Sequence, residues 1–161
     1  MADASVHTTR GTPEGIPLQD GYSTKIALAA SGGDTFSFWE KTVTPPGLDG
    51  GDPVDTTTMH NGTYRTMRAR SLKTMTPVSG TCLYDPNVYN DLLTLINVET
   101  TVTVHFADGS SLAFYGYLRS FVPAAAEEGT SPEAEYTIQP TNWDPTGNVE
   151  GGFDGSYNGS A

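Results

Sequence analysis

The fold class of this chain is decided by residues 101–110, whose sequence is TVTVHFADGS. Polar and apolar residues alternate over the first six positions, which is the period of a strand with one buried face. Asp108-Gly109 then supplies two residues that tolerate the positive φ angles of a tight hairpin turn. Apolar residues return at alternate positions after the turn, at Leu112 and Phe114. The stretch predicts an antiparallel hairpin at the centre of a β-rich domain.

Further strands are expected on both sides of this hairpin, because alternation and β-favouring residues recur there. The expected strands cover residues 22–30, 35–44, 63–84 with a bend at Pro77, and 133–139. Between the second and third of them, residues 45–62 contain several prolines and glycines that a regular ladder excludes. We therefore expect a long loop after the second strand.

One helix is expected at residues 86–96. Asp85 is a favourable N-cap, and Pro86 suits the first helical position. Apolar side chains follow at helical spacing, namely Val88, Tyr89, Leu92, Leu93 and Ile96. The predicted fold class is therefore mostly β, a β-sandwich or small barrel with one flanking α-helix.

Composition and charge divide the chain of 161 residues into three parts. Residues 1–21 lack periodicity and are expected to be an N-terminal arm, and residues 22–145 to form the β domain. Residues 146–161 are rich in Gly, Asn and Ser and are expected to be a flexible C-terminal tail. The formal net charge is −11, and residues 123–161 hold seven acidic residues and no basic one.

This acidity excludes ordinary binding to nucleic acid or to an anionic membrane, since both carry negative charge. The sequence from Met1 shows no secretory signal, and no apolar run is long enough to span a bilayer. Cys82 is the one cysteine, so no disulfide within the chain is expected. These features are typical of a protein that folds in a reducing compartment.

No pattern for catalysis or for a metal ion is found. His7, His60 and His105 stand apart from one another, without the spacing of metal ligands. Residues 49–55 have the acidity of a calcium loop but lack its alternating ligands and its distal glutamate. Cys82 has no neighbouring base in the sequence and is expected to be a buried hydrophobic residue. We expect no enzyme activity, no metal and no cofactor.

Two adjacent segments carry opposite charges. Residues 45–55 hold Asp49, Asp52 and Asp55 without a base, whereas residues 56–84 hold four bases without an acid. The bases are Arg65, Arg68, Arg70 and Lys73. One interpretation is that the acidic loop of one copy docks on the basic strand of another copy. The alternative is that the charges meet within one subunit, and a solvated basic face is the simplest reading.

Several short stretches, taken together and in this order, resemble the major tail tube proteins of long-tailed, non-contractile (siphovirus-type) bacteriophages. The stretches are FWE (38–40), TPPGLDGG (44–51), TTTMHN (56–61), RSL (70–72), YDP (84–86), FADGS (106–110) and PTNWD (140–144). They cover about residues 36–145. The resemblance implies a tail-tube-like β domain with the order of elements described above.

The resemblance also implies a function. In this family six copies close into a ring, and the rings stack into a hollow tube through which DNA leaves without being specifically bound. The implied partners are further copies of the chain and the tail tip, terminator and tape-measure proteins, with no membrane. The implied location is the tail of the virion, assembled in the cytoplasm of the bacterial host.

Positions in this sequence follow from the family's pattern. The loop that reaches the neighbouring ring would include Leu48, Asp49, Asp52, Val54, Asp55 and Met59. The polar strand face with Glu133, Glu135 and Thr137 is the candidate for the lumen. A different class remains open, namely a carbohydrate-binding β-sandwich module that uses Trp39 or Trp143.

Overall fold

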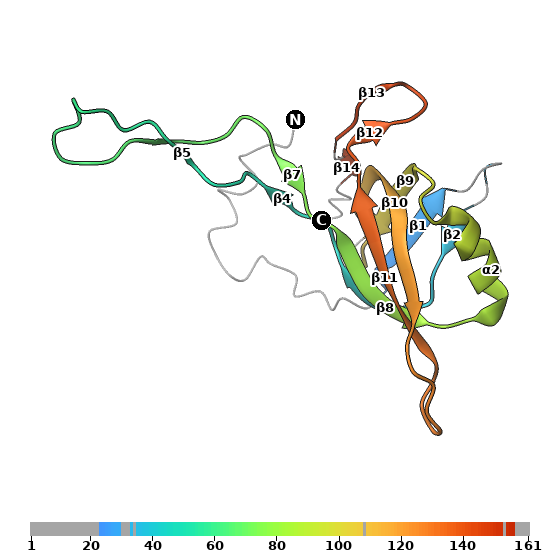
Figure 1. The fold of residues 1–161 in the computed structure, drawn as a ribbon. Helices are drawn as coiled ribbons and strands as arrows, with labels where there is room; N and C mark the ends of the chain where they lie inside the picture. The colour runs from blue at the N-terminus through green and yellow to red at the C-terminus, as the bar shows by residue number, and fades with distance from the viewer. Residues whose placement is uncertain (1–22, 30–32, 34, 108, 153, 157–161) are drawn as a thin grey trace.

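A computed structural model of the chain describes residues 23–29, 33, 35–107, 109–152 and 154–156. Its main element is an antiparallel sheet with the strand order β2-β1-β9-β10-β11-β8-β3, and β14 pairs with β10 beside it (Figure 1). The strands are β1 (Lys25–Ala29), β2 (Thr35–Ser37), β3 (Glu40–Thr44), β8 (Val78–Leu83), β9 (Thr100–His105), β10 (Ser111–Pro123), β11 (Glu133–Pro140) and β14 (Asp154–Ser156).

The sheet curls because its two edge strands, β2 and β3, are consecutive in the chain. Only Phe38 and Trp39 separate them. Within two residues, the chain therefore passes from β2, which pairs with β1 at one edge, to β3, which pairs with β8 at the other edge. Across the remaining opening, the backbone N–H of Ile26 donates a hydrogen bond of 2.7 Å to Oε1 of Glu40. The predicted fold class, mostly β and sandwich-like with one flanking helix, is confirmed. The expected single strand over 35–44 is broken at the point where the chain changes edge.

The central hairpin lies where the sequence predicts it. Strands β9 and β10 pair with Val102 opposite Phe114 and Val104 opposite Leu112. Gly109 has a φ of +83°, as the expected turn requires, while Asp108 lies outside the described residues. Alternate side chains of this hairpin enter the core, which the inner residues of β1, β8 and β11 complete.

The predicted helix is α2 (Pro86–Leu95), which begins as expected and ends one residue early. The Asp85 carboxylate caps it by accepting a hydrogen bond of 2.9 Å from the N–H of Asn87. Its buried face differs in one respect from the expected pattern, because Leu92 and Leu95 are buried whereas Leu93 is 45% exposed. The helix lies beside the strands of the curled sheet (Figure 1), and its buried residues belong to the core.

A long two-stranded arm leaves the sheet between β3 and β8 and projects away from it (Figure 1). Four short strands pair within it: β4 (Leu48–Asp49) with β7 (Thr74–Met75), and β5 (Val54–Asp55) with β6 (Met67–Arg68). The expected loop at 45–62 is therefore only the outgoing part of a longer element. The expected strand over 63–84 is wrong in its first half, because only the short strands β6 and β7 form there and they pair with the outgoing limb. Of this segment, only β8 joins the sheet.

The segment after β11 forms a small hairpin of β12 (Trp143–Asp144) and β13 (Val149–Glu150). Strand β14 then pairs with residues 111–113 of β10. Both β13 and β14 fall within the segment that was expected to be a flexible tail. The expected arm at 1–21 lies outside the described residues, so the three-part division of the chain stays a prediction.

Gly80 has a packing role that the alternating pattern does not reveal. It lies opposite Tyr136, whose hydroxyl donates a hydrogen bond of 3.1 Å to the carbonyl of Thr42. The Tyr136 ring stacks on Phe38, with 4.8 Å between ring centroids. A Cβ at Gly80 would lie 2.1 Å from the Thr42 carbonyl oxygen and 2.4 Å from the Tyr136 hydroxyl. Only glycine leaves room for this ring across the junction of β3 and β8.

We predict that Gly80→Ala lowers the free energy of unfolding by about 1–3 kcal/mol, because backbone and ring must both shift to admit the methyl group. The matched control is Gly50→Ala on the arm, where a Cβ would meet no atom within 4 Å. The control should change stability by about 0.5 kcal/mol or less. Urea denaturation of both variants measures the difference, and equal effects would contradict the packing role of Gly80.

We also predict that Leu92→Ala lowers the free energy of unfolding by about 2–5 kcal/mol, since it removes a buried side chain and leaves a cavity. Leu92 is 2% exposed, whereas the neighbouring Leu93 is 45% exposed. Leu93→Ala is therefore the control and should cost about 0.5 kcal/mol or less. A small effect at Leu92 in urea unfolding would show that α2 does not contribute to the core.

Candidate assembly surfaces

The arm has no core of its own. Every residue from 47 to 74 is exposed, although the segment contains several large apolar side chains. Met59 is fully exposed, Tyr64 is 83% exposed and Leu72 is 82% exposed. Leu48 and Val54, expected from the sequence as contact residues, are exposed as well. Apolar side chains gathered on a projecting element are typical of a protein–protein contact surface.

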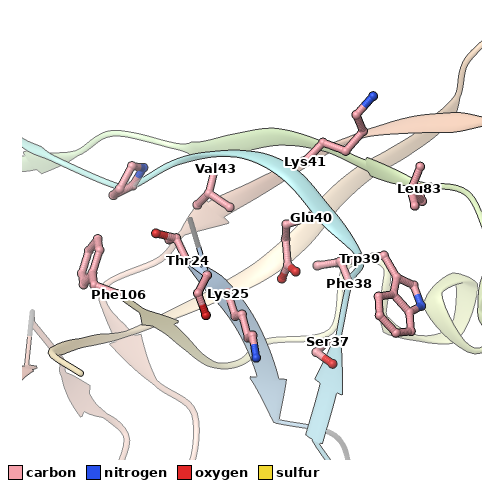
Figure 2. Close-up of a pocket in the computed structure, with 12 residues that line it drawn as sticks. Thr24, Lys25, Ser37, Phe38, Trp39, Glu40, Lys41, Val43, Leu83 and Phe106 are labelled. Carbon is pink, nitrogen blue, oxygen red and sulfur yellow. The ribbon is translucent and has the colours of Figure 1, made fainter. Parts of the chain in front are cut away.

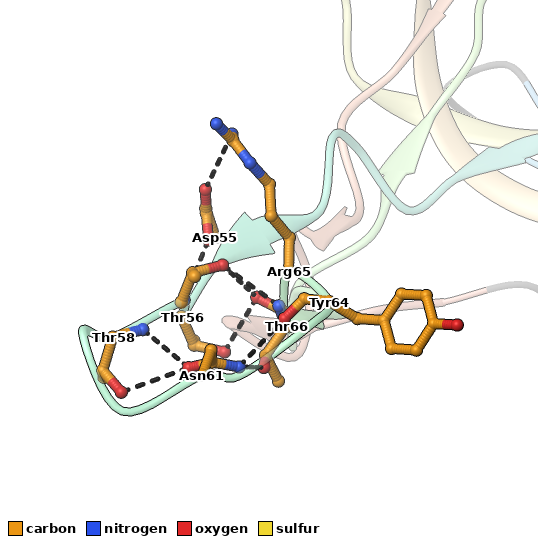
Figure 3. A network of polar contacts seen from close by, with 8 residues as sticks. Asp55, Thr56, Thr58, Asn61, Tyr64, Arg65 and Thr66 are labelled. Atoms are coloured by element: carbon orange, nitrogen blue, oxygen red, sulfur yellow. Dashed lines mark hydrogen bonds and ion pairs between the residues drawn. The ribbon is translucent and has the colours of Figure 1, made fainter.

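The tip of the arm is nevertheless held in one shape by a polar network around Asn61 (Figure 3). The Asn61 side-chain oxygen accepts hydrogen bonds from the N–H and the hydroxyl of Thr58, at 2.8 and 3.1 Å. Its amide nitrogen donates to the carbonyl of Tyr64 at 3.1 Å. Thr56 and Thr66 close the neck below it, with an N–H to carbonyl distance of 2.9 Å. The tip is therefore preorganised although it is solvated.

We predict that Asn61→Ala loosens the tip and leaves the sheet unchanged. A hydrogen bond contributes about 0.5–1.5 kcal/mol, so amide exchange at Thr58 should accelerate by up to about tenfold. The free energy of global unfolding should stay within about 0.5 kcal/mol of the wild type, because no core residue is involved. Hydrogen exchange resolved by residue measures both quantities. Asn90→Ala on the exposed side of α2 is the control, and equal exchange at Thr58 in the two variants would contradict the prediction.

The acidic and basic segments of the sequence are the two limbs of this one arm. Nη1 of Arg65 lies 3.6 Å from Oδ2 of Asp55, and Nε of Arg70 donates a hydrogen bond of 2.8 Å to the carbonyl of Asp52. Hydrogen bonds from Thr57 hold the pKa of Asp55 below its usual range, because they stabilise the charged carboxylate. The Thr57 hydroxyl contributes most, and the Thr57 N–H, 2.9 Å from Oδ1, contributes less. The structure thus brings Arg65 and Asp55 together within one subunit, in line with one of the interpretations given for these segments.

Two basic side chains of the arm are not paired with an acidic group of the described residues. Arg68 and Lys73 have no hydrogen bond or ion pair to any residue that the structure describes. Asp49 is turned toward its own loop, where it accepts a hydrogen bond of 2.8 Å from the N–H of Gly51. None of these contacts tests whether the acidic limb of one copy docks on the basic limb of another copy. That docking stays a prediction.

The lumen candidates share one face of β11. Ala134, Tyr136 and Ile138 are buried, so Glu133, Glu135 and Thr137 project to the outer side of the sheet. Thr81 of β8 lies opposite Glu135, and its hydroxyl is 2.9 Å from that of Thr42. Lys41 forms an ion pair with Glu133. The outer side of β3, β8 and β11 is therefore a hydroxyl-rich face with carboxylates near one end.

An opening of about 930 Å³ lies between β1 and β3, where the strands diverge (Figure 2). Glu40 projects into it between Lys25 and Phe38, and Phe106 lies at its other end. Burial, with a smaller contribution from the Glu40 carboxylate, raises the pKa of Cys82 to about 11, so this buried thiol stays protonated near neutral pH. Cys82 does not line this opening, whose polar side chains include Glu40, Lys25 and Ser37.

The two histidines within the described residues do not converge on a site. His60 lies at the exposed tip of the arm and His105 at the exposed end of β9, while His7 is outside the described residues. Within the described ranges, no three His, Cys, Asp or Glu side chains are grouped as metal ligands. Nor does this part of the chain contain a helix long and apolar enough to cross a membrane.

Comparison with known proteins places the fold. No family model matches the sequence, and no curated protein matches it. Among solved structures, the chain is similar to one from the virion of a native gene transfer agent particle, with a TM-score of 0.60 and 12% identity over 86% of this chain and 99% of that one. A second similar chain comes from the tail of an empty gene transfer agent particle, refined with C6 symmetry. Its TM-score is 0.58 and its identity 13%, over 86% of this chain and 99% of that chain.

A third similar chain comes from the six-fold symmetrised baseplate of the anti-feeding prophage. It has a TM-score of 0.61 and 5% identity, over 78% of this chain and 93% of that chain. At such low identities the similarity establishes the fold and not the activity. The fold is therefore one that occurs in chains of virion, tail and baseplate assemblies.

Proposed function

We propose that this chain is a structural protein of a phage-type tail. In the specific form of the proposal, six copies close into a ring and the rings stack into the tail tube of a long-tailed, non-contractile phage. DNA leaves through this tube at infection without specific binding. The subunits assemble in the cytoplasm of the bacterial host, together with tail tip, terminator and tape-measure proteins, and the final location is the virion.

The observation that carries the proposal is the exposed arm on a fold shared with chains of tail assemblies. A monomer gains nothing from a projecting element of almost thirty residues whose apolar side chains all face solvent. In an assembly, the same element buries those side chains against a neighbour. The similar chains come from assemblies with C6 or six-fold symmetry, which favours a six-membered ring for this chain.

The charge of the chain supports the conduit role. A wall that lets DNA slide must not hold phosphates, and a net charge of −11 opposes such contacts. The hydroxyl-rich outer face with Glu133, Glu135 and Thr137 is the part of the sheet we assign to the lumen. Threonine and serine hydroxyls there keep the surface polar without attracting the backbone of DNA.

The carbohydrate-binding alternative is not favoured by the positions of the tryptophans. Trp39 adjoins Leu83 at the end of β8, whereas Trp143 follows β11 at the opposite end of the sheet. The two rings therefore do not form one platform for a sugar. The structural role in a tail explains more of the exposed surface than a glycan site does.

Electron microscopy of the concentrated, purified protein tests the proposal. We expect stacked six-membered rings, and a reconstruction in which Glu135 and Thr137 line the inner wall. A variant whose residues 49–74 are replaced by a short Gly-Ser turn should fold but fail to stack, since it lacks the contact element. A wild type that stays monomeric at high concentration, or an inner wall dominated by Lys and Arg, would contradict the proposal.

A further inference from the structure

The curled sheet stays open along one seam, between the first half of β1 and β3. Strand β2 pairs only with residues 27–29 of β1, so the edge of β1 before Ala27 has no neighbouring strand among the described residues. The opening of about 930 Å³ lies along this seam (Figure 2). Folded proteins normally cover such an edge with another part of the chain or with a partner.

A side chain substitutes for the missing strand at one point of the seam. The Ile26 N–H, which lies on the open edge of β1, donates its hydrogen bond of 2.7 Å to the Glu40 carboxylate. A backbone N–H at a sheet edge ordinarily bonds a carbonyl of the next strand. Glu40 therefore satisfies this group but leaves the rest of the opening uncovered.

The other end of the seam leaves the margin of the core incompletely covered. Val43 and Phe106 pack against the core, yet both are only half-buried and both line the opening (Figure 2). Burial of their remaining surface by an apolar side chain would be favourable, since each Å² of apolar surface removed from water contributes about 25 cal/mol. The opening thus fits an occupant with apolar side chains.

The chain itself arrives at this opening. The part that the structure describes begins with Ser23, which lines the opening and has a φ of +72°, a left-handed conformation typical of turns. Residues 15–22, which lie outside the described residues, have the sequence GIPLQDGY, with apolar side chains at Ile16 and Leu18. Because extended chain spans about 3.4 Å per residue, Leu18 can reach up to about 17 Å from Ser23.

We infer that residues 16–22 fold back into the opening of their own subunit. Ile16 and Leu18 pack on Val43 and Phe106 and complete the core margin there. Attachment at Ser23 holds this segment beside the opening at a roughly millimolar effective concentration. The same segment of another copy would first lose translational and rotational freedom. The occupant is therefore the chain's own segment.

The charges at the mouth of the opening agree with this occupant. Lys25 lines the opening and has no ion pair to any residue that the structure describes. Asp20 is the single charged residue of the segment 16–22, and the turn would bring it near Lys25. The inference goes beyond the proposed tail function and does not depend on it. It leaves only residues 1–15 of the expected N-terminal arm for contacts with other molecules.

A cross-link within one chain tests the position of the segment. Leu18→Cys/Val43→Cys is treated with a short bismaleimide, while native Cys82 stays buried. We expect the tryptic peptides 11–25 and 42–65 to be joined within single chains. The control Leu18→Cys/Asn90→Cys, with its second cysteine on the exposed side of α2, should give a yield at least about fivefold lower. A mixture of the two single variants Leu18→Cys and Val43→Cys should give no linked copies.

Urea unfolding tests whether the segment contributes to the folded subunit. Ile16→Ser/Leu18→Ser should lower the midpoint by roughly 0.5–1 M, because two apolar side chains no longer cover the core margin. Val6→Ser, which removes an apolar side chain outside the segment, is the control and should leave the midpoint unchanged. Equal midpoints for the double variant and the wild type, equal cross-linking at Val43 and Asn90, or links formed only between copies would each overturn the inference.

Discussion

The change of edge between β2 and β3 is the constraint on which the rest of the structure depends. Phe38 turns inward at this point and stacks on Tyr136, and Tyr136 lies over Gly80 to reach the Thr42 carbonyl. This packing sets β3 against β8. The arm begins where β3 ends and returns to the sheet where β8 begins. The pairing of β3 with β8 therefore holds both ends of residues 45–76 together, so that this segment is a projecting hairpin rather than an open loop.

The arm obtains order without a core. Its backbone forms two short pairs of strands. At the tip, side chains such as that of Asn61 form hydrogen bonds with backbone N–H and carbonyl groups. A loop that is already ordered loses less conformational entropy when it binds, so more of its contact energy appears as affinity. The polar network and the exposed apolar side chains are therefore complementary features, because one fixes the shape that presents the other.

The sequence predicts the local elements well, because they depend on local signals. The alternation after Thr101 and the Asp85 cap are read directly from neighbouring residues. The pairing inside the arm is different, since Val54 meets Arg68 and Asp55 meets Arg65 through a register that no apolar pattern encodes. The same holds for the candidate site: the charged segments are visible in the sequence, but their contact within one arm is not. Gly80 needs Tyr136, more than fifty residues away, before its role can be recognised.

The distribution of the bases offers a way for so acidic a chain to bind copies of itself in the proposed assembly. A net charge of −11 on every copy produces a general repulsion, which a random contact must overcome. Four of the eight bases stand between residues 65 and 73, on an element that reaches beyond the acidic body. In the assembly that we propose, attraction between copies would therefore come chiefly from the arm. A uniform charge of either sign would favour no orientation, whereas bases concentrated on one projecting element favour contacts made by that element.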